Sequence, residues 1–84
     1  MKQIYLGLAD GKYFLNFRGL RDSIKEAKQY ETIQEVIVGL PQKRKFILTY
    51  DKEVPQEDIN TIKEKAKKDN HFQLEDITLD ERYK

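Results

Sequence analysis

The stretch that decides the fold is Met1–Arg18, MKQIYLGLADGKYFLNFR, with the dipeptide Asp10-Gly11 near its centre. Asp-Gly between alternating apolar residues is the strongest short signal for a β-hairpin, because a two-residue type I′ turn needs a positive φ at both central positions. The stretch therefore predicts two antiparallel strands joined by a two-residue loop at Asp10-Gly11.

This register divides the hairpin into two faces, since side chains alternate along a strand. The face expected to be buried holds three apolar pairs: Ile4 with Phe17, Leu6 with Leu15, and Leu8 with Tyr13. The opposite face holds Gln3 with Arg18, Tyr5 with Asn16, and Gly7 with Phe14. Three apolar pairs on one face are typical of a half-buried antiparallel ribbon.

The spacing of apolar residues changes after Gly19, where they recur every three or four positions: Leu20, Ile24, Ala27 and Tyr30. This spacing predicts an amphipathic helix of about three turns. Two alternatives follow for the next segment. A helical stripe continues to Gly39, whereas the β-branched run Val36-Ile37-Val38 is typical of a strand. We favour a strand over residues 34–39.

A turn is expected at residues 39–42, followed by a strand over Lys45–Tyr50 in which apolar side chains alternate. Val54-Pro55 then predicts the start of a helix with proline at its first position. Acidic residues come early in this helix and lysines late, which suits the helix dipole. Its narrow apolar stripe is Ile59, Ile62 and Ala66.

Asn70 is a candidate left-handed cap for that helix, and residues 72–79 are predicted to form the last strand. Phe72 and Leu74 alternate on one face of this strand, whereas Ile77 and Leu79 fall on the other, which indicates a bulge or a two-sided strand. Residues 80–84 are expected to form a frayed tail.

The predicted order is thus ββαββαβ within one small α+β domain spanning residues 1–84. We expect a two-layer sandwich, with a largely antiparallel sheet and both helices on one face. A chain of 84 residues is long enough for one domain only.

Composition narrows the classes of function. Sixteen Lys and Arg nearly balance fifteen Asp and Glu, so the chain is neither a basic nucleic-acid tail nor an acidic disordered segment. No apolar run is long enough for a membrane span, and the apolar stretch near Met1 is too short for a secretory signal. The chain has no cysteine, which favours a reducing compartment, the cytoplasm, and excludes thiol chemistry.

Catalysis is not expected. There is a single histidine, and the four glycines are too scattered for a phosphate-binding loop. The carboxylate pairs are sequence neighbours, such as Glu57-Asp58 and Asp80-Glu81, so their side chains diverge in regular structure. We expect no enzyme activity and no cofactor.

The outward face of the hairpin is the first candidate binding surface. Tyr5 and Phe14 beside Arg18 would form a patch for a protein partner, or a platform on which bases stack. The structural alternative is specific, because an aromatic often covers a strand glycine and Phe14 lies opposite Gly7. Burial of this face under the helices would also remove the patch. The structural alternative is the more common situation.

Lys43, Arg44 and Lys45 form the second candidate, since three positive charges at a turn can bind phosphates. The helix lysines would extend this surface: Lys63, Lys65, Lys67 and Lys68. However, basic turns are common on solvated surfaces and protect sheet edges, and at 100° per residue the helix lysines spread around the helix.

A metal site is the third and weakest candidate. It would combine His71 with nearby carboxylates from Asp69, Glu75 or Asp76, because zinc accepts both nitrogen and oxygen ligands. A lone histidine after a helix end is more often a surface residue stabilised by the helix dipole.

We therefore expect a non-catalytic module that binds a host protein by steric blockade, with Tyr5, Phe14 and Arg18 as anchors and Lys43, Arg44 and Lys45 in the same contact surface. In size and composition the chain resembles small inhibitors encoded by phages and mobile elements, including anti-CRISPR proteins, although no motif carries this resemblance. The alternatives are a nucleic-acid-binding domain and a metal-binding accessory protein. Pairing of strand edges into a homodimer also remains open.

Overall fold

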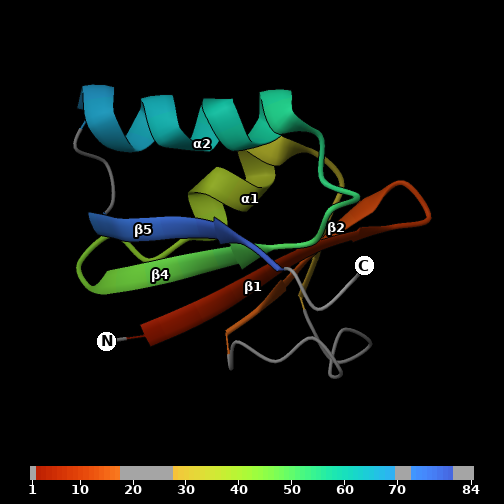
Figure 1. Cartoon of the computed structure of the whole chain (residues 1–84), viewed down its shortest axis with the longest axis horizontal. Helices are drawn as coiled ribbons and strands as arrows, with labels where there is room; N and C mark the ends of the chain where they lie inside the picture. Colours follow the sequence, from red (N-terminus) through yellow and green to blue (C-terminus); the bar gives the residue numbers. More distant parts are fainter. Residues whose placement is uncertain (1, 18–27, 70–72, 81–84) are drawn as a thin grey trace.

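The computed structural model describes residues 2–17, 28–69 and 73–80, and shows a five-stranded sheet with two helices on one face (Figure 1). In chain order the elements are β1 (Lys2–Ala9), β2 (Lys12–Asn16), β3 (Lys28–Tyr30), α1 (Ile33–Gly39), β4 (Lys45–Tyr50), α2 (Gln56–Asp69) and β5 (Gln73–Leu79). The predicted α+β class is confirmed. Neither α1 nor α2 is long and apolar enough to cross a membrane.

The hairpin of β1 and β2 forms in the predicted register. Tyr5 faces Asn16, and Leu6 faces Leu15. The turn has φ values of 53° at Asp10 and 73° at Gly11, so both central residues are left-handed, as a type I′ turn requires. Leu6 and Leu15 are fully buried, which confirms that the aliphatic face points into the core.

The sheet is mixed, with strand order β3-β2-β1-β4-β5. The pairs β1–β2 and β2–β3 are antiparallel, whereas β1–β4 and β4–β5 are parallel. The expectation of a largely antiparallel sheet is therefore only half right. The reason is the crossover through α2, which returns the chain to the end of the sheet where β4 began, so that β5 runs parallel to β4.

The strand predicted over residues 34–39 is wrong, because this segment is helix α1. Its buried residues recur at the helical spacing: Ile33, Val36 and Ile37, followed by Leu40 just beyond the helix. A strand would have placed Val36 and Ile37 on opposite faces, whereas a helix buries both against the sheet. Burial on one face thus outweighs the strand preference of the β-branched run.

Helix α1 also has a defined start. The side chain of Thr32 accepts a hydrogen bond from the backbone N–H of Glu35, at 3.2 Å. The Glu35 carboxylate in turn accepts one from the backbone N–H of Glu31, at 2.9 Å. These two bonds satisfy donors at the helix start and resemble a capping box, for which Thr-x-x-Glu is the sequence signature.

Residues 28–30 form strand β3, although the apolar spacing from Leu20 to Tyr30 predicted a helix there. Tyr30 pairs with Tyr13 and Lys28 pairs with Leu15, both antiparallel on β2. The prediction is therefore wrong for residues 28–30. The rest of the predicted helix, residues 20–27, lies outside the described part of the chain.

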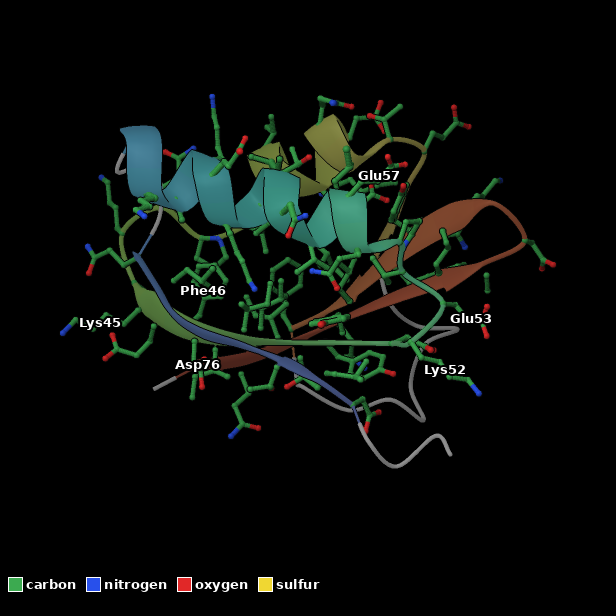
Figure 2. All side chains as sticks on the ribbon, turned by 45° about the horizontal axis from the view of Figure 1, so that its top comes forward. Lys45, Phe46, Lys52, Glu53, Glu57 and Asp76 are labelled. Atoms are coloured by element: carbon green, nitrogen blue, oxygen red, sulfur yellow. The ribbon has the colours of Figure 1, made fainter. Side chains whose placement is uncertain are left out.

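Helix α2 lies on the same side of the sheet as α1 (Figure 1). It begins at Gln56, one residue later than predicted, and the Pro55 carbonyl accepts hydrogen bonds from the N–H groups of Asp58 and Ile59. The predicted stripe is confirmed: Ile59 and Ile62 are fully buried, and Ala66 packs against the core. Figure 2 shows Phe46, also fully buried, between α2 and the sheet. The predicted cap Asn70 lies outside the described residues.

Strand β5 contains a bulge, which is one of the two alternatives that the sequence indicated. Leu74 pairs with Phe46 and Asp76 with Ile47, so that Glu75 is an extra residue between the two pairs. As a result, Leu74 and Ile77 both pack against the core. After the strand, Asp80 is buried and its N–H donates to the carbonyl of Tyr50 at 2.8 Å. The predicted frayed tail therefore does not include Asp80.

The turn geometry yields a prediction about stability. Gly11→Ala places a Cβ at a φ of 73° without a steric contact to another residue, so the cost is backbone strain alone. We expect a loss of about 1 kcal/mol in the free energy of unfolding, measured by urea denaturation. Asp10→Asn is the control and should be close to neutral, because asparagine tolerates the left-handed region. An unchanged stability for Gly11→Ala would show that the turn is of another type.

Candidate functional site

The structure contains an open groove at one edge of the sheet, between β3 and α1. Its volume is about 520 Å³, which is within the range of small-molecule and peptide sites. Six residues line it: Lys28 and Tyr30 from β3, and Gln34, Glu35, Val38 and Gly39 from α1. The groove therefore combines an outer strand with the exposed side of a helix.

Tyr30 lines the groove and contacts Gly39 at the end of α1. A methyl group at Gly39 would lie 2.8 Å from Cζ of Tyr30, which is closer than atoms in contact can approach. Glycine is therefore the residue that lets the ring lie against the helix. Burial raises the pKa of Tyr30.

Val38 gives the groove its apolar wall. Its side chain is 72% exposed, because Val36 and Ile37 occupy the side of α1 that faces the sheet. In the described residues, the other large apolar side chain with high exposure is Leu79, at 45% on the opposite edge strand β5. A valine this exposed beside an apolar groove suits contact with a partner.

Charged groups lie at the groove as well. The ammonium group of Lys28 lies 5.9 Å from the centroid of the Tyr30 ring, within range of a cation–π interaction. The Glu35 carboxylate accepts the N–H of Glu31. The groove therefore carries a cation on its strand side and a hydrogen-bonded carboxylate on its helix side.

The predicted patch on the outward face of the hairpin does not form as expected. Tyr5 is 1% exposed, so the expectation that its ring is available to a partner is wrong. Phe14 is half-buried and lies opposite Gly7, in the pairing that the structural alternative describes. Arg18 lies outside the described residues. The structure therefore does not bring two exposed aromatics together on this face.

The predicted basic surface is exposed. Lys43, Arg44 and Lys45 are all open to solvent, in the segment that leads into β4. Figure 2 places Lys45 at the opposite end of the molecule from Lys52 and Glu53. The C-terminal end of α2 is at the same end as the start of β4 (Figure 1).

On α2, Lys63 and Lys67 are exposed and Lys65 is half-buried, while the side chain of Lys68 lies outside the described residues. Lys63 and Lys67 are one helical turn apart and share a side of α2, whereas Lys65 is on another side of the helix. The three lysines whose side chains are described therefore do not form a single row along α2.

The candidate metal ligands are only partly described. Glu75 and Asp76 are exposed on β5, at the bulge, and the Asp76 carboxylate accepts the N–H of Ile77 at 2.8 Å. His71 and the side chain of Asp69 lie outside the described residues. In residues 2–17, 28–69 and 73–80, no three potential ligands group together.

A hydrogen bond between distant segments connects the hairpin to α2. The Tyr13 hydroxyl donates to the Asp58 carboxylate in the first turn of the helix. This bond, with burial and the charges of Asp58 and Glu57, raises the pKa of Tyr13 to about 12. Tyr13 is therefore protonated at neutral pH, and the pair acts as a link between two elements.

Comparison of the chain with protein-family models, curated proteins and solved structures found no match.

The sequence pattern does not predict the groove, because it places Tyr30 in a helical stripe and Val38 in a strand. The Thr32-x-x-Glu35 pattern was the available signal. Read as a helix start, it places Val36 and Ile37 inward and Val38 outward. The contact of Tyr30 with Gly39 has no local signal, because it depends on how β3 and α1 pack.

The Tyr13–Asp58 bond predicts a dependence of stability on pH. The pKa of Tyr13 is about 12 in the folded protein and about 10 in the unfolded chain. The contribution of the protonated Tyr13 hydroxyl to folding stability is therefore complete below pH 10 and is lost as the pH rises towards 12. For Tyr13→Phe we expect the free energy of unfolding to be about 1 kcal/mol lower than that of wild type at neutral pH. Above about pH 10, the free energy of unfolding of this variant should fall less steeply than that of wild type.

The measurement is urea unfolding as a function of pH, with tyrosinate absorbance to follow ionisation. Tyr50→Phe is the matched control. The absorbance titrations of wild type and Tyr13→Phe are then compared. If the tyrosine that the variant lacks has an ordinary pKa, the assignment of the raised pKa to Tyr13 is wrong.

Proposed function

We propose that this chain is a protein-binding module without catalytic activity of its own, and that its binding surface is the groove between β3 and α1. The observation that supports this most is Val38, which is 72% exposed on the wall of an apolar groove. Exposed apolar surface next to a pocket is typical of interaction sites. The surface proposed here replaces the hairpin patch, because Tyr5 is buried.

Within this class, we propose an inhibitor that blocks a surface of a host protein. Support comes from the size of the chain, its many charges of both signs, and its resemblance in composition to small phage and mobile-element inhibitors. Exposed charges such as Lys43, Arg44 and Glu75 would orient the encounter and increase its rate. The lack of cysteine supports action in the cytoplasm.

A matched pair of variants tests the binding surface. Val38→Asp puts a charge on the groove wall, whereas Leu79→Asp puts the same charge on the opposite edge strand. In affinity capture from host cells, we expect Val38→Asp to lose at least about tenfold of the partner retained by wild type, because an apolar contact becomes a buried charge.

Leu79→Asp should retain the partner in this experiment, and both variants should remain folded because each position is exposed. Equal recovery of the same proteins by wild type and Val38→Asp would refute the groove as the binding surface.

Nucleic-acid binding is the second candidate, and the exposed run Lys43, Arg44 and Lys45 is the observation in its favour. Phosphate contacts through these residues would make affinity fall steeply as salt rises. Titration with short oligonucleotides at about 50 and 200 mM salt separates the candidates. The protein-binding proposal predicts no measurable binding at the lower salt, whereas salt-dependent binding that Lys43→Glu abolishes would support the second candidate.

A further inference from the structure

The register of the hairpin determines which backbone groups of β3 face outward. In a two-residue hairpin, Ala9 and Lys12 exchange both of their backbone hydrogen bonds, and this pattern alternates along β2. Phe14 therefore bonds to β1, while Tyr13 and Leu15 direct their N–H and C=O groups towards β3. Lys28 faces Leu15 and Tyr30 faces Tyr13, so the backbone N–H and C=O groups of Lys28 and Tyr30 point towards β2 and bond there. Gln29 is left with its N–H and C=O pointing away from the sheet.

A hydrogen bond beyond the strand supports this alternation. Two residues after Gln29, the N–H of Glu31 must also point outward, and it donates to the Glu35 carboxylate instead of to β2. That donor is therefore already used. Within the described residues, the outer edge of β3 offers one complete donor–acceptor pair, at Gln29. A strand that pairs here has its register set by that residue.

The side chains on either side of Gln29 define what such a strand would meet. Lys28 and Tyr30 are on the helix side of the sheet and line the groove, one step before and one step after Gln29. Residues of an added strand opposite these two would be two positions apart and would point into the groove.

The chemistry at these two positions differs. Tyr30 lies against Gly39, and Val38 lines the same groove, so the position beside Tyr30 suits an apolar side chain. The position beside Lys28 has an ammonium group whose observed interaction is with the Tyr30 ring. This charge is available to an incoming carboxylate, which would form an ion pair and add specificity.

We infer that the partner adds an extended segment to the edge of β3 as a sixth strand, bonded to the backbone of Gln29. The segment carries an apolar side chain beside Tyr30 and Val38, and a carboxylate two residues away beside Lys28. This mode of recognition takes affinity from backbone bonds and specificity from alternate side chains. The inference deepens the proposed function and depends on it.

A library of random displayed heptapeptides, selected on the intact wild-type protein, tests the inference. We expect enriched peptides to carry an aliphatic residue and an Asp or Glu two positions apart. Synthetic copies of the enriched peptide should bind Val38→Asp at least roughly tenfold more weakly, while Leu79→Asp binds as wild type does. Lys28→Glu should select a basic residue in place of the acidic one.

Gln29→Pro tests the backbone contact directly. Proline removes the outward N–H without breaking a bond to β2, so the melting temperature should remain near that of wild type while peptide affinity falls roughly tenfold or more. Unchanged affinity in this variant, with the fold retained, would overturn strand addition.

Three other outcomes overturn the inference. The first is a selection that enriches no peptide, and the second is a set of enriched peptides without an acidic and an apolar residue two positions apart. The third is self-association of the wild type that Val38→Asp abolishes, because the occupant of the groove would then be a second copy of the chain. Loss of cellular capture by Val38→Asp, combined with failed peptide selection, would retain the proposed function and reject only strand addition.

Discussion

The structure depends on one local constraint, the pair of positive φ angles at Asp10 and Gly11. This turn fixes the register of β1 on β2, and the register decides that Leu6 and Leu15 face the helices. A shift of one residue would send the aliphatic face to the other side of the sheet. Because β3 pairs with β2, the same turn also determines which groups of β3 face outward.

The helices follow from the face that the hairpin presents. Both lie on the same side of the sheet, where α2 supplies Ile59 and Ile62 and α1 supplies Val36 (Figure 1). The bulge at Glu75 allows β5 to add Leu74 and Ile77 to this core. One layer of apolar side chains therefore holds the two layers together.

The sequence predicted the features that depend on neighbouring residues. The hairpin, the alternation in Lys45–Tyr50, the stripe of α2 and the bulge in β5 each have a local signal in turn chemistry or spacing. The predictions of secondary structure and exposure were wrong where contacts between residues distant in sequence determine the structure. Val36-Ile37-Val38 has strand preference but is helical because of a cap and a sheet beneath it. Neither the parallel β1–β4 pairing nor the burial of Tyr5 has a local signal, and the groove requires both β3 and α1.

The proposed addition of a strand to β3 depends on the outward-facing amide of Gln29, and amide hydrogen exchange measured by NMR tests that orientation most directly. Groups bonded in the sheet exchange slowly, whereas amides that face solvent exchange quickly. We predict slow exchange for the N–H groups of Lys28 and Tyr30 and fast exchange for that of Gln29. Protection of Gln29, with fast exchange at Lys28 and Tyr30, would contradict the register and remove the edge to which a sixth strand is proposed to bind.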